Sequence, residues 1–204
     1  MPQTRGASRD RIIDSTLALI AERGWQRTGL ADIAQAAGLN LAQLHRHFES
    51  KDEILLAHMA RIDDAMLKGR AATGESPRQR LEDVLMHRFK VMGPYRAAHR
   101  ALRRGLIADP VAGLKTLLHL RHALRWALEA AGIESGGRTG RLRLKGLGVI
   151  YLATLCVWFN DDSDDLAGTR AELDKHLRRA ERLARWLPQR QPEDGQAGPA
   201  PSAP

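Results

Sequence analysis

Apolar residues recur every three or four positions along almost the whole chain, which is the spacing of one face of an α-helix. The apolar face of the first such segment carries Ile13, Thr16, Leu17 and Ile20. Alternation of apolar and polar residues, which would indicate strands, never persists. The sequence therefore predicts an all-α fold. A chain of 204 residues with 43% hydrophobic content is also long and apolar enough to bury a core.

Glycine, proline and polar clusters divide this pattern into separate helices. Gly24 suits the left-handed position after the first helix, Gly38 suits a tight turn, and Ser50 and Glu53 have the spacing of a capping box. The first expected helix stops at Gly24, and others cover about residues 29–37, 41–48, 95–108, 111–131, 141–160 and 165–187. One helix follows Ser50 and runs past Met66, and another begins near Pro77 and includes Phe89. Residues 132–140 are expected to be a glycine-rich loop. The proline- and glycine-rich residues 188–204 are expected to be disordered.

Composition narrows the classes of function only slightly. The net charge of +8 suits an anionic partner such as nucleic acid, although many proteins without such a partner are basic. The single cysteine, Cys156, excludes an intrachain disulfide, and its apolar neighbours predict a small buried side chain. The longest apolar run, residues 147–159, is shorter than the roughly 20 residues that span a bilayer, so it predicts a buried helix. Residues 1–10 lack the apolar segment of a secretory signal, and we expect a cytoplasmic protein.

Residues 28–51 carry the most specific pattern, which is typical of two short helices joined by a tight turn. Close packing of such a pair needs a small residue on the first helix, glycine in the turn and apolar residues on both. Ala34, Gly38 and Leu44 meet these needs. Glutamine and arginine on the outer face of the second helix can bond the edges of adenine and guanine in the major groove. The residues expected to contact DNA from this helix are Asn40, Leu41, Ala42, Gln43, His45, Arg46 and His47.

The spacing of Ala34, Gly38 and Leu44, followed by a His-Arg-His-Phe ending and Lys51, resembles the helix-turn-helix of the TetR family of bacterial repressors. The resemblance covers about residues 10–56. It implies a dimer on a palindromic operator, with a three-helix DNA-binding domain at the N-terminus. It also implies that the hydroxyl of Thr28 lies near a phosphate and that Lys51 meets the DNA backbone.

Three positions depart from the usual family pattern. Tyrosine is usual where this chain has His45, and small hydroxylated residues are usual where it has Gln43. A basic or polar residue is common where it has Leu41. The operator sequence therefore stays open.

A second resemblance lies near the C-terminus. Residues 151–158, the acidic loop after them and residues 166–173 are similar to the COQ9 family of lipid-binding accessory proteins of ubiquinone biosynthesis, which have a TetR-like fold. This similarity implies an isoprenoid or acyl ligand. It leaves open an alternative function, that of a lipid-binding accessory protein that does not bind DNA.

The expected domains are residues 1–50 for DNA binding and residues 51–187 for ligand binding and dimerisation. Apolar side chains between the helices of the second domain are candidates for a pocket that takes a small apolar effector. The expected pocket residues are Met59, Met66, Leu85, Phe89, Met92, Tyr95, Leu118 and Trp126. The TetR resemblance implies that the last two helices pair with their symmetry mates in a homodimer. The expected interface residues are Leu147, Ile150, Tyr151, Thr154, Leu155, Trp158, Leu166, Leu173 and Leu177.

Metal sites and catalytic sites are disfavoured. His119 and His122 share one helix face, but no cysteine or carboxylate completes a ligand set at standard spacing. The acidic loop at residues 161–165 lacks the glycine and terminal glutamate of an EF-hand. No pairing of a nucleophile with a base can be read from the sequence. We therefore expect a ligand-responsive repressor rather than an enzyme, without a metal or a cofactor.

Overall fold

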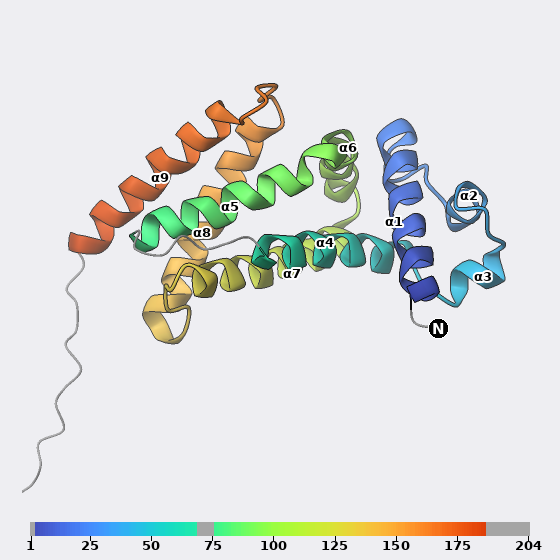
Figure 1. Ribbon diagram of the computed structural model, residues 1–204, viewed down its shortest axis with the longest axis horizontal. Helices are drawn as coiled ribbons and strands as arrows, with labels where there is room; N and C mark the ends of the chain where they lie inside the picture. Colours follow the sequence, from blue (N-terminus) through green and yellow to red (C-terminus); the bar gives the residue numbers. More distant parts are fainter. Residues whose placement is uncertain (1–2, 69–75, 187–204) are drawn as a thin grey trace, which may run out of the picture.

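The computed structural model describes residues 3–68 and 76–186 of the chain (Figure 1). Within these ranges the regular structure is entirely helical, which confirms the predicted all-α fold and its N-terminal helix-turn-helix. The expected disordered tail, residues 188–204, lies outside the described residues. The helices are α1 (Gln3–Arg23), α2 (Leu30–Ala36), α3 (Leu41–His45), α4 (Lys51–Lys68), α5 (Pro77–Met92), the short 3-10 helix η1 (Gly93–Tyr95), α6 (Arg96–Ile107), α7 (Pro110–Ala130), α8 (Gly137–Trp158) and α9 (Ala167–Trp186).

Local sequence signals explain where several helices begin and end. Gly24 has φ +84° after α1 and Gly38 has φ +68° after α2, so both occupy the left-handed region that favours glycine. Asp109 caps α7 with a side-chain oxygen that accepts a backbone N–H at 3.1 Å. One half of the predicted capping box of α4 is present, because the Glu53 N–H donates to the Ser50 hydroxyl at 3.2 Å. The Glu53 carboxylate accepts from the Glu49 N–H at 2.7 Å instead of from Ser50.

Buried apolar side chains form two clusters within the described residues. The first cluster joins α1, α2, α3 and the start of α4, and it includes Trp25, Phe48 and, from α6, Leu102. The second lies among α5, α7, α8, α9 and the rest of α4, and it includes Phe89 and Trp158. Helix α4 contributes to both clusters, so it connects the N-terminal helices to the larger body physically as well as in sequence.

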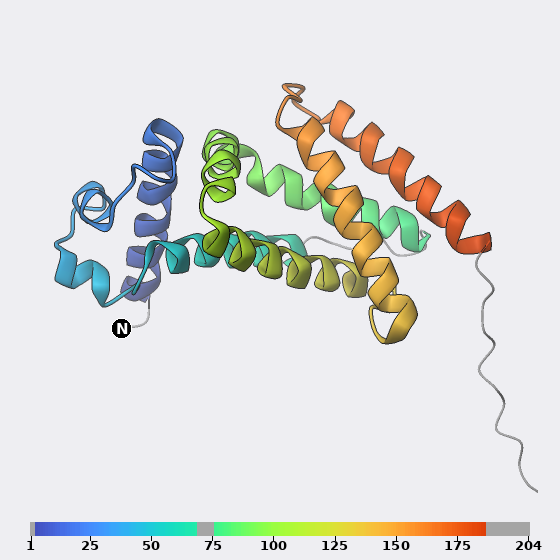
Figure 2. The ribbon, with the colours of Figure 1, turned by 180° about the vertical axis from the view of Figure 1, so that it is seen from behind.

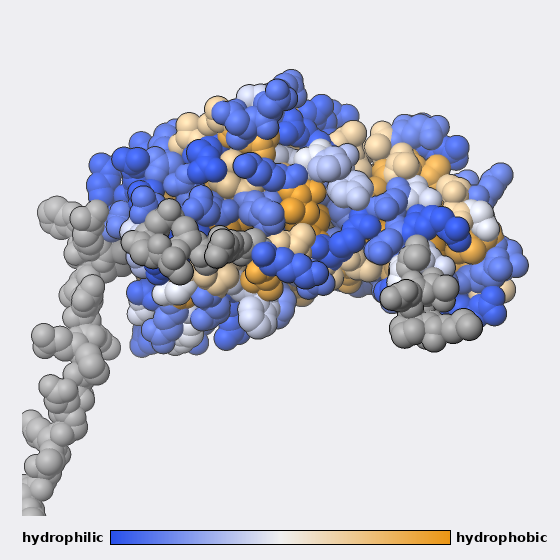
Figure 3. Space-filling view, viewed as in Figure 1, coloured by the Kyte–Doolittle hydropathy of each residue, from blue (hydrophilic) through white to orange (hydrophobic). Residues whose placement is uncertain are grey.

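The helices of the larger body form layers, with the helix-turn-helix at one end (Figure 1). Helix α9 runs beside α5 and contacts both α5 and α8. Seen from behind, α6, α7 and α8 lie in front of α5 (Figure 2). The face shown in Figure 3 is mostly hydrophilic, with apolar residues in patches between the helices. No helix in residues 3–68 and 76–186 is long and apolar enough to cross a membrane.

Two predicted helix ends are wrong. Helix α3 ends at His45 rather than at Phe48, because the chain turns there and places the Phe48 ring in the first apolar cluster, 2% exposed. Helix α8 begins at Gly137, inside the stretch 132–140 that was expected to be a loop. Gly140 permits this early start, because a Cβ there would lie 2.2 Å from the Ser135 carbonyl carbon.

Two predictions about burial on α8 are also wrong. Cys156 is exposed rather than buried. The run at residues 147–159 is not a fully buried helix, since Val149 is 70% exposed and Leu152 is 45% exposed. This part of α8 carries apolar side chains all around its circumference, but α7 and α9 cover only part of it. The side chains on the remaining part are therefore exposed.

The N-terminal helices meet the larger body where α6 packs against α1. A Cβ on Gly105 would lie 2.4 Å from the Trp25 Cβ, so only glycine permits this approach. The indole Nε1 of Trp25 donates to an Asp109 carboxylate oxygen at 3.3 Å, and the Gln26 amide donates to the Gly105 carbonyl at 3.2 Å. These contacts fix the position of the helix-turn-helix relative to α6.

We predict that Gly105→Ala destabilises the protein by about 1–3 kcal/mol, because the added methyl group overpacks the contact with Trp25. Thermal unfolding followed by circular dichroism measures this. The matched control is Gly6→Ala, an exposed position on α1 where no atom outside the neighbouring helix backbone lies within 4 Å of the added Cβ. The control should stabilise the protein by about 0.5–1 kcal/mol, the gain in helix propensity. If Gly105→Ala unfolded at the wild-type temperature, the close approach of α6 to Trp25 would be disproved.

Candidate functional site

The turn between α2 and α3 has the geometry that its sequence predicts. Ala34, Ala37 and Leu44 are each at most 2% exposed and pack the two short helices together. The Leu39 N–H donates to the Ala34 carbonyl at 2.8 Å, which closes the turn at Gly38. The predicted packing residues of the helix-turn-helix are therefore confirmed, and they leave one side of α3 uncovered.

The start of α3 is held by a reciprocal pair of hydrogen bonds. The Asn40 side chain accepts from the Gln43 N–H at 2.8 Å, and the Gln43 side-chain oxygen accepts from the Asn40 N–H at 2.8 Å. This capping box fixes the first turn of a helix of only five residues. It also means that the side-chain oxygen of Gln43 is already bonded, which leaves its NH₂ group to meet a base.

The exposed side of α3 collects most of the predicted DNA contacts. Leu41 is 55% exposed. The other exposed members are Asn40, Ala42, His45 and Arg46, while Gln43 and His47 are half-buried. At the end of the segment, the Arg9 guanidinium from α1 donates to the His47 carbonyl at 2.7 Å and lies 4.1 Å from the centre of the Phe48 ring. The sequence pattern did not reveal this support from α1, since nothing in the spacing links Arg9 to Phe48.

The two residues expected to meet phosphates bond carbonyls of their own chain, Thr28 from a buried position and Lys51 from a half-buried one. Thr28 is 1% exposed, and its hydroxyl donates to the Gly24 carbonyl at 2.9 Å. The Lys51 ammonium donates to the carbonyls of Trp25 and Thr28 at 2.7 and 3.0 Å and stacks on the Trp25 ring at 4.1 Å. Burial lowers the pKa of Lys51 despite the opposing effect of Asp109. In this conformation both side chains hold the link between α1 and α2.

The positive charge of the chain is concentrated away from the helix-turn-helix. Residues 1–58 carry seven lysines and arginines and seven aspartates and glutamates. Residues 96–145, which form α6, α7 and the start of α8, carry eleven basic and three acidic residues. The excess charge of +8 therefore says little about how α3 would meet DNA.

The predicted pocket residues fall into three groups. Four of them, Met66, Leu85, Phe89 and Met92, are buried in the second apolar cluster, while Met59 and Tyr95 are partly buried beside the first. The last two lie on the outer side of α7, where Leu118 is 55% exposed and Trp126 is 49% exposed. Both side chains are open to solvent in the single chain, so a place in a pocket between helices stays a prediction for them.

A polar network lies inside the larger body, among residues that the apolar pattern did not reveal. The Arg88 guanidinium is 3% exposed; it donates to the Asp63 carboxylate and, at 3.1 Å, to the Tyr151 hydroxyl. His119 bonds the other Asp63 oxygen at 2.8 Å. Burial alone would raise the pKa of Asp63, but the bonds from His119 and Arg88 outweigh it and lower the pKa. The buried arginine is thus neutralised by one carboxylate.

A second buried contact joins α4 to α6. His58 and His99 are 1% and 7% exposed, and their Nε2 atoms are 3.1 Å apart, so one imidazole donates and the other accepts. Burial lowers the pKa of His58 to about 2 and that of His99 to about 4. Both rings are therefore neutral at physiological pH. The two histidines that the sequence offered as possible metal ligands, His119 and His122, have protein partners. His119 bonds Asp63, and His122 accepts from the Trp126 indole at 2.9 Å.

The predicted interface residues of α8, α9 and the loop between them are largely covered within their own chain, and their place in a dimer stays a prediction. Seven of them, Leu147, Tyr151, Thr154, Trp158, Leu166, Leu173 and Leu177, are at most 5% exposed, and Ile150 and Leu155 are partly buried. They pack within their own chain and leave little surface for another. The exposed side of α8 instead presents Leu142, Val149, Leu152 and Cys156, with Leu142 56% exposed.

Comparison with known proteins agrees with this geometry. Residues 12–58 match the family model described as "Bacterial regulatory proteins, tetR family". The chain is 29% identical over 85 residues to the HTH-type transcriptional repressor KstR of Rhodococcus jostii, an alignment that covers 41% of this chain and 40% of KstR. It is 32% identical over 123 residues to the HTH-type transcriptional regulator BetI of Burkholderia cenocepacia, covering 57% of this chain and 62% of BetI. The chain thus matches less than two thirds of the length of either relative.

Solved structures extend the likeness to the whole fold. A TetR transcriptional regulator from Nitrosomonas europaea superimposes with a TM-score of 0.70 at 24% identity, covering 88% of this chain and 98% of that one. The fatty acid degradation regulator FadR from Bacillus halodurans gives a TM-score of 0.60 at 17% identity, covering 83% of this chain and 94% of that one. At these identities the likeness concerns the fold. Residues 12–58 thus match the helix-turn-helix of the TetR family of bacterial regulatory proteins, and the chain as a whole shares the fold of these solved regulators.

Proposed function

We propose that this protein is a ligand-responsive transcriptional repressor that binds a palindromic operator as a homodimer and is released by a small apolar effector. The observation that carries the proposal is the uncovered side of α3, which follows a tight helix-turn-helix and presents Arg46 and His45 to solvent. A short helix that projects polar side chains fits the major groove. Such a protein would act on DNA in the cytoplasm, and KstR, one of its relatives, is named as a repressor.

The residues of α3 divide by the contacts they could make. Arg46 is exposed, and its guanidinium could bond a guanine edge. Leu41 and Ala42 could contact a thymine methyl group. Asn40 and Gln43 hold each other in the capping box, so they position the helix and leave NH₂ groups for bases or phosphates. His45 and His47 complete the set of proposed contacts. Thr28 and Lys51 would act indirectly, by holding α2 against α1.

Dimerisation is proposed through the outer side of α8. Val149, Leu152 and Cys156 follow one another at helical spacing and are exposed in the single chain. A shallow depression at the end of this face is lined by Cys156, Val157, Asn160, Asp161 and Gly168. A second copy related by a two-fold axis could cover both features, since the same patch then meets itself.

The proposed effector site lies where α4, α5, α6 and α8 meet around Phe89, Met92 and Trp158. Helix α4 runs from this region to the helix-turn-helix, and α6 runs from it to Trp25. A ligand can release DNA only if it prefers a conformation in which the two reading helices are wrongly spaced. Both helices offer a physical connection for that change.

The first functional prediction concerns wild-type protein and DNA. Selection from random duplexes should enrich a two-fold symmetric site whose half-sites lie about one helical turn, 34–36 Å, apart, and binding should weaken as salt increases. If no two-fold site were enriched, the repressor proposal would fail and a lipid-binding protein without DNA binding would replace it.

The second prediction distinguishes a residue that contacts bases from a residue that stabilises the fold. Arg46→Ala should weaken binding to the selected site by about tenfold or more and relax the preference at one base pair, as expected for the loss of one good base contact. Lys51→Met should instead lower the midpoint of thermal unfolding, because its ammonium holds two carbonyls of the α1–α2 link. Arg121→Ala, on the exposed side of α7, is the matched control and should change neither quantity. An unchanged base preference in Arg46→Ala would contradict the proposed contact.

The third prediction concerns the dimer. Val149→Asp and Leu152→Asp should each convert the dimer to a monomer in analytical ultracentrifugation, because a buried unpaired carboxylate opposes association. Leu118→Asp is the control, since this leucine is equally large, 55% exposed and on α7. If only the control dissociated the dimer, the interface would lie on α7 instead of α8.

A further inference from the structure

Three buried nitrogen atoms lack a hydrogen-bond partner among the described residues at the junction of α4, α6 and α8. They are His58 Nδ1, Arg96 Nε and Trp158 Nε1. Ring contacts connect them: the centres of His58 and His99 are 5.1 Å apart, those of His99 and Trp158 are 6.1 Å apart, and the Arg96 guanidinium lies 4.9 Å from the Trp158 ring. A buried donor left without an acceptor costs about 1–3 kcal/mol, so three at one junction need an explanation.

Two of these nitrogens can only donate. The guanidinium of Arg96 and the indole of Trp158 have no acceptor atom, whereas the role of His58 Nδ1 depends on its tautomer. Trp158 is 0% exposed and lies against Phe89, with ring centres 6.0 Å apart, so the surroundings of the donors are apolar. A ligand that matches this junction would carry an oxygen acceptor on an otherwise apolar molecule.

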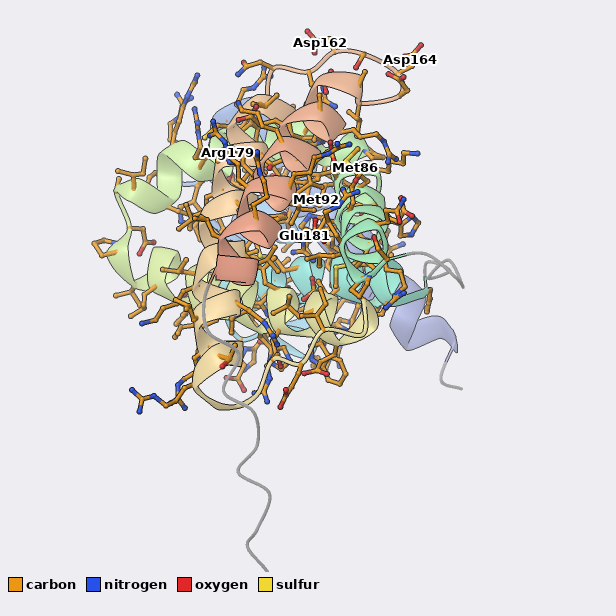
Figure 4. All side chains as sticks on the ribbon, turned by 90° about the vertical axis from the view of Figure 1, so that its left-hand side faces the viewer. Met86, Met92, Asp162, Asp164, Arg179 and Glu181 are labelled. Atoms are coloured by element: carbon orange, nitrogen blue, oxygen red, sulfur yellow. The ribbon has the colours of Figure 1, made fainter. Side chains whose placement is uncertain are left out.

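Charge determines which kind of acceptor fits best. The Arg88 cation is matched by the buried Asp63 carboxylate. Arg96 is 20% exposed, donates to the Asp161 carbonyl and has Asp162 as a counterion only at 3.5 Å, with the Asp162 side chain 93% exposed. Asp162 lies in the loop between α8 and α9, at the edge of the molecule in Figure 4. The junction therefore holds one partly buried cation without a buried counterion, which favours a carboxylate over a neutral group.

We infer that the effector is an apolar carboxylate, either aromatic or a medium-chain acyl group, whose oxygens bond Arg96 Nε and Trp158 Nε1 while its hydrocarbon part lies against Phe89. This inference rests on the proposed function and names the ligand class of its effector site. Arg96 is the first residue of α6, and the same helix carries His99 and, near its other end, Gly105 against Trp25. A carboxylate that engages Arg96 thus acts on the helix that positions the helix-turn-helix.

The test uses full-length protein and four probes: 4-propylbenzoate and octanoate as carboxylates, 4-propylphenol as a neutral polar analogue and propylbenzene as an apolar analogue. Isothermal titration calorimetry should give tighter binding for one or both carboxylates than for the phenol, and no specific binding of propylbenzene. In protein with ¹⁵N-labelled tryptophan, the carboxylate should shift the indole N–H signal of Trp158, which Trp158→Phe assigns. The shift itself is measured in the wild-type protein, and the variant serves only to assign the signal.

Arg96→Gln and Trp158→Phe should each weaken carboxylate binding by about tenfold or more, the effect of one hydrogen bond to a charged group. Arg121→Gln, an exposed arginine on α7, should leave it unchanged. Equal or tighter binding of 4-propylphenol, or no binding of either carboxylate, would overturn the inference, and so would an unaffected Arg96→Gln. Operator binding is measured separately. A carboxylate that binds without changing operator affinity supports the site but defeats the sensing role. Protein that binds no selected operator even without a ligand defeats the proposed function alone.

Discussion

The contact between α6 and Trp25 is the constraint on which the rest of the structure depends. Gly105 lets the two backbones approach, and Asp109 and Lys51 hold the indole from two sides. Because Lys51 also bonds the carbonyls that precede α2, the same group of side chains fixes both the domain contact and the entry to the helix-turn-helix. Helix α6 is therefore joined to the helix-turn-helix by packed, hydrogen-bonded side chains.

The larger body combines an apolar core with a polar centre. Asp63, Arg88, His119 and Tyr151 satisfy one another, so that network fixes how α4, α5, α7 and α8 meet. The neighbouring junction around Trp158 is different, because its donors have no acceptor among the described residues. A completed network makes a rigid core, whereas an incomplete one gives a ligand something to bind. The domain thus combines a satisfied polar network with the junction that we propose as its ligand site.

The sequence predicted the features that depend on local spacing. The glycine at position 38, the packing of Leu44 and the cap at Ser50 follow from patterns within a few residues, and the structure confirms them. Features that depend on distant partners could not be read in this way. Periodicity identifies an apolar face on α8 but not which residues its own chain covers, so Tyr151 was assigned to an interface although it is buried beside Phe89.

Methylation interference on the selected operator tests most directly the central claim that α3 reads the major groove. The guanine N7 atom lies in that groove, where an arginine such as Arg46 would bond it. The account predicts that N7 methylation blocks binding in two patches related by two-fold symmetry, with centres about 10 base pairs apart. It also predicts that Arg46→Ala abolishes the effect at one guanine of each patch. Binding that tolerates methylation at every guanine N7, or is blocked only by modification in the minor groove, would contradict it.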